Sequence, residues 1–133
     1  MQYEYFYGSQ AEQFSFYRIP KALFTEPNFR ELSTDAKVLY GILLDRMSLS
    51  LKNQWLDAQN KVYIIFTVEE IMDALNCANQ KATRLMVELE KQAGLIERKR
   101  QGLGRPNLIY VKNFAATINN KSCEKGCLLY TSD

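Results

Sequence analysis

Amide, hydroxyl and basic side chains gather in two short stretches of the sequence. The first stretch carries Asn79, Gln80, Lys81, Thr83 and Arg84. The second stretch carries Arg98, Lys99, Arg100 and Arg105. Amide and guanidinium groups make paired hydrogen bonds to planar polar partners such as base edges, and Lys and Arg neutralise phosphates. The chemistry that these residues predict is the recognition of a polyanion.

The charge of the chain is distributed unevenly over its 133 residues. Residues 78–112 hold eight Lys and Arg against three Asp and Glu, a net charge of +5, whereas residues 1–77 have a net charge of −3. Such an asymmetry favours one surface made for a polyanion, although an ordinary solvated face could carry the same charges.

Catalysis and metal binding find little support in the sequence. The chain has no histidine, which removes Ser-His-Asp and Cys-His catalysis and His-ligated zinc. Cys123 and Cys127 lack a second pair of ligands, and Gln101–Asn107 is glycine-rich but lacks the Gly-Lys-Ser/Thr of a phosphate-binding loop. No paired carboxylates lie outside the expected helix faces. We therefore expect no enzymatic activity, no metal, no cofactor and no small-molecule substrate.

The cysteines and the apolar stretches favour a cytoplasmic protein. Three cysteines are an odd count, which argues against a disulfide framework and for a reducing compartment. Cys77 is expected to be a small buried apolar residue. The longest apolar stretches, such as Val62–Phe66, are too short to span a bilayer, and no secretory signal is visible at the first residues.

The first half of the chain predicts one long helix and short strands. The helix begins near Ser33 or Thr34, which can cap it, and ends near Leu49–Ser50. Its apolar residues recur at spacings of three and four: Ala36, Leu39, Tyr40, Leu43, Leu44 and Met47.

Two of the expected strands lie on either side of that helix. Phe14–Ile19 alternates enough to predict a short strand that ends at Pro20. Lys61–Thr67 is β-branched and aromatic and is typical of a second strand, which could form a small hairpin with Trp55-Leu56.

Two short helices and a hairpin follow. A capping box at Thr67–Glu70 starts the first helix, and Asn76–Ala78 separates it from a second helix over Asn79–Gln92, with Asn79 at its cap and Gly94 after its end. A hairpin with a long tip at Gln101–Asn107 is then expected from two strands, Leu95–Arg100 and Leu108–Phe114.

This order of elements predicts an α+β fold, a winged helix-turn-helix with a small antiparallel sheet and a C-terminal β-hairpin wing. In that fold the second helix enters the major groove of double-stranded DNA, and the wing lies along phosphates or in the minor groove. We expect sequence-specific DNA binding. Two alternatives remain: a transcriptional repressor that uses the same surface, and a protein-docking winged helix. Each element also has a simpler interpretation, a solvated helix or a plain hairpin turn.

A family resemblance covers residues 14–114. The segments FYRIPKALF, LSTDAKVLYGILLDRMSLS, NQWLDAQNKVYIIFT, LNCANQKATRLMVELE and GLIERKRQGLGRPNLIYVKNF resemble the N-terminal domain of the replication initiator A family. Members of that family occur on plasmids and mobile elements of low-GC Gram-positive bacteria. The resemblance implies binding to repeated DNA sites at a plasmid replication origin, as a homodimer. It places base reading on the five residues named for the first stretch and the wing role on the four residues named for the second stretch, and so agrees with the residues chosen above.

The two ends of the chain are expected to lie outside the domain. Residues 1–13 form an arm whose aromatic residues are a candidate dimer interface, with a frayed tail as the alternative: Tyr3, Tyr5, Phe6 and Tyr7. Residues 115–133 are expected to be a disordered or aberrant tail that stands where the family continues into its C-terminal domain.

Overall fold

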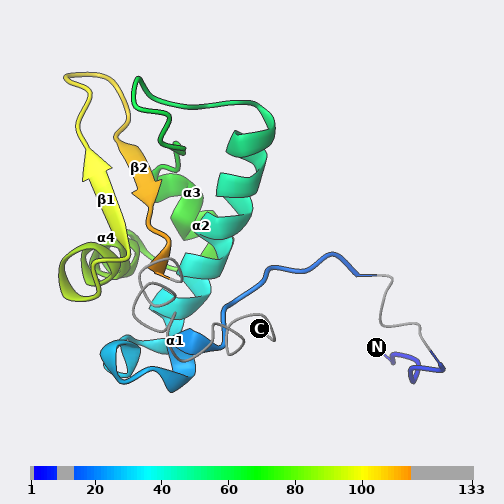
Figure 1. The fold of residues 1–133 in the computed structure, drawn as a ribbon. Coiled ribbons are helices and arrows are strands. Elements are labelled where there is room, and N and C mark those ends of the chain that lie inside the picture. Colours follow the sequence, from blue (N-terminus) through cyan, green and yellow to red (C-terminus); the bar gives the residue numbers. More distant parts are fainter. Residues whose placement is uncertain (1, 9–13, 115–133) are drawn as a thin grey trace, which may run out of the picture.

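The computed structural model describes residues 2–8 and 14–114, and Figure 1 shows a helical body with a hairpin along one side. The helices, in chain order, are α1 (Ala22–Thr25), the 3₁₀ turn η2 (Pro27–Phe29), α2 (Thr34–Lys52), α3 (Val68–Leu75), α4 (Asn79–Val87) and the π-helical turn η3 (Glu88–Gln92). Two strands, β1 (Ile96–Lys99) and β2 (Leu108–Val111), pair antiparallel. The predicted α+β class, with helices and a small antiparallel sheet, is confirmed.

Helix α2 forms the centre of the body. Ser33 is its N-cap, and its Oγ accepts a hydrogen bond from the backbone N–H of Ala36 at 3.2 Å. The predicted start is therefore confirmed, whereas the helix runs on to Lys52, past the predicted end. Leu39 and Leu43 are fully buried, so the three-and-four spacing of apolar residues does mark the face that packs in the core.

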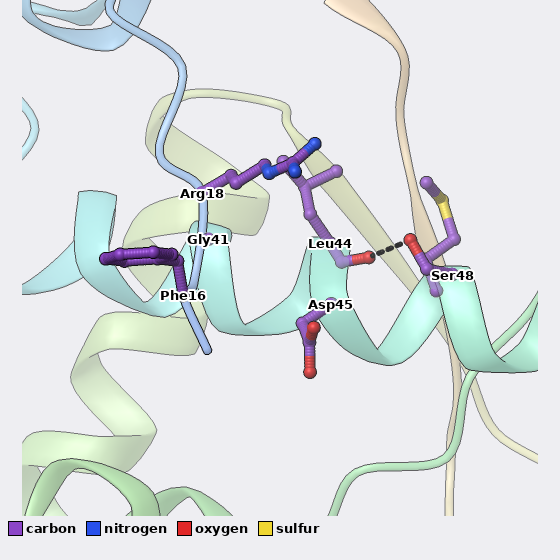
Figure 2. A pocket seen from close by; sticks show the side chains of 7 residues that line it. Phe16, Arg18, Gly41, Leu44, Asp45 and Ser48 are labelled. Carbon is purple, nitrogen blue, oxygen red and sulfur yellow. Dashed lines mark hydrogen bonds between the residues drawn. The ribbon is translucent and has the colours of Figure 1, made fainter. Parts of the chain in front are cut away.

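The segment before α1 is not the predicted strand. Residues 14–19 have no strand pairing, because they lie across α2 and not beside a sheet edge. Gly41 makes the crossing possible: a Cβ there would lie 2.8 Å from Ile19 Cγ1 and 3.0 Å from the carbonyl oxygen of Arg18. Figure 2 shows Phe16 and Arg18 on this segment where it passes Gly41. A cavity of about 440 Å³ lies beside the crossing.

The expected strand Lys61–Thr67 is present only as two single bridges. Leu56 pairs with Val62, which confirms the small hairpin in its shortest form, and Ile64 pairs with Ile109 of β2. Asn60 has a φ of 66° at the turn between the paired residues. Within the described residues, only Ile64 of this segment pairs its backbone with β2, so no continuous strand forms.

The helix pair follows the prediction at its start and departs from it at its end. Thr67 and Glu70 form the complete capping box of α3, and Asn76 ends that helix with a φ of 53°. Asn79 is the first residue of α4 and not its cap, which is Ala78. The expected single helix to Gln92 is wrong in its last turn, because α4 ends at Val87 and η3 continues with π-helical geometry. Gly94, with a φ of 68°, follows the turn as expected.

The hairpin is held to the body by apolar side chains. β1 and β2 pair in one register, from Ile96 opposite Val111 to Lys99 opposite Leu108, and both strands are shorter than predicted. Ile96 and Ile109 are buried in the common core, together with α4 residues such as Leu85. Cys77, predicted to be buried, is half-buried and packs against this core.

Tyr40 links α2 to the end of the hairpin and makes the fold sensitive to high pH. Its hydroxyl donates to the carbonyl oxygen of Lys112 at 2.9 Å, and burial raises its pKa from 10.0 to about 12. The stabilisation is complete below pH 10 and is lost as the pH rises to about 12, by about 1.4 kcal/mol per pH unit.

We expect the Tyr40→Phe variant to lack this loss, because phenylalanine has no proton to release. Urea unfolding of the original chain and the variant at several pH values between 9.5 and 11.5 gives their free energies of unfolding. The difference between the two free energies should become smaller as the pH rises. If the free energy of unfolding fell equally in the two proteins, Tyr40 would not be the cause of the loss of stability at high pH.

Candidate nucleic-acid interface

The first half of α4 presents polar side chains on one face and apolar side chains on the other. Ala82, Leu85 and Met86 are buried against the body. The exposed side chains on the outer face are Asn79, Gln80, Thr83 and Arg84. The structure therefore brings four of the predicted base-reading residues to one accessible surface.

The N-terminus of α4 adds positive potential to this surface. No side chain of the described residues caps it, and its first turn holds no acidic residue. The first backbone N–H groups of a helix carry its positive dipole end and can bind a phosphate. The positive start of the helix and the side chains of Gln80 and Arg84 thus both favour a partner that carries phosphate groups.

Lys81, the fifth predicted residue on α4, is bound within the chain. Its Nζ lies 2.6 Å from Asp35 Oδ2 in the first turn of α2. The lysine side chain is 41% exposed and the aspartate 50%, so the pair is open to solvent and of small energy. This contact ties the start of α4 to the start of α2.

Arg98 of the wing is also engaged within the chain. Its guanidinium lies 2.7 and 2.9 Å from Glu90 Oε1, and its backbone N–H donates to Glu90 Oε2. Burial raises the pKa of Glu90, but the hydrogen bonds and the positive charge of Arg98 outweigh it, so the net pKa lies below the ordinary value. Glu90 therefore stays ionised and fastens β1 to η3.

The tip of the wing carries the other predicted cations. Lys99, Arg100 and Arg105 are exposed around the turn between β1 and β2. Figure 1 shows the hairpin rising from the end near α4 to a tip that stands away from the helices. A cavity of about 260 Å³ lies between the wing and the helix pair and is lined by Arg98 and Arg105 of the wing and by Ile71 of α3 and Met86 of α4.

The loop beside the wing holds a further polar contact that the sequence did not suggest. Tyr110 donates its hydroxyl to Asp57 Oδ2 at 3.0 Å, across 53 positions of sequence. The backbone N–H of Lys61, together with that of Gln59, lowers the pKa of Asp57. Burial and the Asp57 carboxylate raise the pKa of Tyr110. This pair joins the turn after α2 to β2.

Other kinds of site are not indicated by the part of the chain that the structure describes. Within residues 2–8 and 14–114, no three His, Cys, Asp or Glu side chains form a group that could hold a metal ion. None of the helices in these ranges has the length and apolar character needed to cross a membrane.

The family model described as the N-terminus of replication initiator protein A matches residues 15–125 of the chain. The chain belongs to this replication initiator family. The resemblance seen in the sequence is thereby confirmed, and the matched range contains α4, η3 and the whole wing.

Solved structures resemble this initiator-family domain over most of its length. One is described as the N-terminal domain of a DNA binding protein, with 35% identity, a TM-score of 0.69, and coverage of 90% of this chain and 96% of that one. Another is described as a Rep–DNA complex, with 34% identity, a TM-score of 0.69, and coverage of 89% and 95%. A third, an MDR initiator, has 40% identity, a TM-score of 0.66, and coverage of 83% and 86%.

One sequence relative is much longer than the chain. It is a 41 kDa protein of Lactobacillus helveticus, 32% identical over 92 residues, which make up 69% of this chain and 26% of the relative. The chain therefore spans about a quarter of the length of that relative.

The acidic partners in this replication initiator domain were not found from the sequence. Asp35 and Glu90 neutralise Lys81 and Arg98, and Glu88 accepts hydrogen bonds from the backbone N–H and the hydroxyl of Ser33. Glu88 and Ser33 are 55 positions apart, so no local spacing could indicate their contact. The sequence shows that Glu88 and Glu90 are acidic, but it does not show which elements of the fold they connect.

Proposed function

We propose that residues 14–114 are a winged-helix domain that binds double-stranded DNA sequence-specifically at repeated sites of a plasmid replication origin. The observation that carries this proposal is the exposed polar face of α4 beside a basic wing, in a chain of the replication initiator family. The solved relative described as a Rep–DNA complex supports it. The domain would act in the cytoplasm, by binding alone and without catalysis.

Each part of the surface has a separate task in this proposal. Gln80 and Arg84, with Asn79 and Thr83, contact base edges in the major groove, because amide and guanidinium groups make paired bonds to adenine and guanine. Lys99, Arg100 and Arg105 contact phosphates, which position the protein without reading sequence. Lys81 and Arg98 stay in the proposed interface, where Asp35 and Glu90 fix their positions.

A second copy of the chain is the proposed protein partner. Aromatic side chains of residues 2–8 are exposed, Tyr3 and Tyr5 by 85% and 84%, and Figure 1 shows this arm away from the helical body. Phe6 meets Phe14 edge-to-face, with ring centroids 6.0 Å apart, so the arm has an aromatic face to offer. The predicted tail, residues 115–133, lies outside the described residues.

We expect replacement of Tyr3, Tyr5 and Phe6 by serine to weaken self-association, since these rings would no longer bury apolar surface against the second copy. Sedimentation velocity over a range of protein concentrations measures the change. The domain from residue 14 onward should keep its fold in the variant, as checked by circular dichroism. A dimer of unchanged affinity would remove the arm from the interface.

The first test of DNA binding is a fluorescence anisotropy titration of the chain. Overlapping duplex fragments of the replicon that encodes the chain are compared with scrambled duplexes, at low and at near-physiological salt. We expect one fragment to bind at least about a thousandfold more tightly than its scrambled version. Weak binding to all duplexes that disappears with salt would contradict the proposal.

The position of the bound fragment separates initiator from repressor. A repeated array at the origin supports the initiator, whereas a single site beside a promoter supports a repressor that uses the same surface. Absence of specific binding to every fragment would favour a protein-docking winged helix.

A further inference from the structure

A fully exposed leucine lies in the turn at the end of the wing. Leu103 lies between Gly102 and Gly104 in the turn that joins β1 to β2, and it is 100% exposed. Both glycines have positive φ, 123° and 78°, a backbone conformation that a side chain would strain. The two glycines thus leave Leu103 as the one side chain at the apex of the turn.

The turn that presents Leu103 is held by hydrogen bonds within the wing. The backbone N–H of Arg105 donates to the carbonyl oxygen of Gly102 at 3.3 Å. The side-chain amide of Gln101 donates to the carbonyl oxygen of Pro106 at 2.8 Å. A turn of this kind is ordinarily served by small or polar residues, which tolerate water. An apolar side chain held outward is therefore unexplained by the needs of the turn itself.

The surroundings of Leu103 are cationic. Residues 98–107 contain four Lys and Arg and no Asp or Glu. Arg100 and Arg105, on either side of the apex, are both exposed. The complementary partner has an apolar recess with negative charge along both edges. The minor groove of DNA fits this description where a base step opens, because the opened step exposes apolar base faces and the rims of the groove are lines of phosphate.

We propose that Leu103 enters the minor groove next to the major groove occupied by α4 and there partly unstacks one base step. The inference rests on the proposed DNA-binding function. Apolar wedges of this type open a step and bend the duplex away from the minor groove. Arg100 and Arg105 hold the phosphates on the two sides of the opened step. Pyrimidine–purine steps are the easiest to unstack, so Leu103 confers a sequence preference that no hydrogen bond supplies.

The test compares Leu103→Ala with Leu103→Met on the duplex found by the titration above. Methionine keeps the apolar reach of leucine, and alanine removes it. Bending is measured by fluorescence resonance energy transfer between the duplex ends. Unstacking is measured with a fluorescent purine analogue placed in turn at each step of the site. We expect the original chain and Leu103→Met to bend the duplex and to brighten the analogue at one step.

Leu103→Ala is expected to abolish the bend and the brightening and to bind about tenfold more weakly, because the duplex no longer buries a leucine side chain. Its unfolding midpoint should not change, because Leu103 is fully exposed in the free protein. Leu51→Ala is the matched control, since Leu51 is also exposed but lies in the last turn of α2. This control should bend and bind like the original chain.

The outcomes separate the wedge from the function on which it rests. A bend and an analogue signal that persist in Leu103→Ala would overturn the wedge and leave DNA binding intact. A chain that binds no duplex specifically would instead remove the proposed function. Binding to anionic vesicles that Leu103→Ala abolishes, with duplex binding unchanged, would overturn the wedge in favour of a lipid surface.

Discussion

The double variant Gln80→Ala, Arg84→Ala is expected to lose about 2–6 kcal/mol of discrimination between the specific duplex and a scrambled one, at about 1–3 kcal/mol for each paired contact to a base. Both side chains are exposed on α4, opposite the buried Ala82 and Leu85, so their removal leaves the core untouched. Alanine also suits a helix. Anisotropy titrations of both duplexes at one salt concentration measure the loss.

A second double variant provides the contrast. Arg100→Ala, Arg105→Ala should weaken binding to every duplex by a similar factor, because phosphate contacts carry no sequence information. The slope of log affinity against log salt should become less steep by about 0.9 for each phosphate that the variant no longer neutralises. If the α4 double variant instead weakened all duplexes equally, the base-reading assignment would be wrong. If the wing double variant left the salt slope unchanged, the phosphate assignment would be wrong.

The ion pairs divide the predicted site into two groups of residues. Lys81 and Arg98 each hold a carboxylate within the chain, so a phosphate would have to compete with Asp35 or Glu90 for them. The remaining predicted residues face solvent, and none of them takes part in an ion pair within residues 2–8 and 14–114. We infer that Arg98, in the more buried of the two pairs, acts mainly by positioning the wing, and that the exposed residues make most of the contacts.

Local chemistry explains why much of the fold could be predicted from the sequence. The cap at Ser33, the capping box at Thr67 and Glu70, and the end of the helix before Gly94 depend on residues within four positions of each other. The order of these elements then predicts the helix pair and the hairpin. The candidate residues on α4 and the wing tip follow from that order and from charge.

The features that were missed depend on contacts between distant parts of the chain. Residues 14–19 alternate like a strand, but a strand needs a neighbour, and they meet the face of α2 at Gly41. The helix pattern continues smoothly through Glu88–Gln92, although the backbone there is π-helical. No residue type marks a π-turn. Glu88 and Glu90 in this turn contact residues at the start of α2 and on β1, far from them in the sequence.

Glu88, in this turn, makes a contact between distant elements whose loss should lower the stability of the fold. Its two carboxylate oxygens accept from the backbone N–H and from the hydroxyl of Ser33, the N-cap of α2. The end of α4 is thereby joined to the start of the central helix. Glu88 is half-buried, so water replaces these bonds only in part once the carboxylate is gone. Hydrogen bonds to a charged group contribute about 1.5–3 kcal/mol each.

We expect the Glu88→Ala variant to lose about 3 kcal/mol of unfolding free energy, less than the sum of two such bonds because Ser33 can still cap α2. Urea unfolding followed by circular dichroism measures it. Glu88→Gln should recover part of the loss, since its amide oxygen still accepts from the Ser33 backbone. Glu69→Ala, at an exposed position in the first turn of α3, is the matched control and should change stability far less. A Glu88→Ala variant no less stable than this control would show that the contact with Ser33 does not hold α4 against α2.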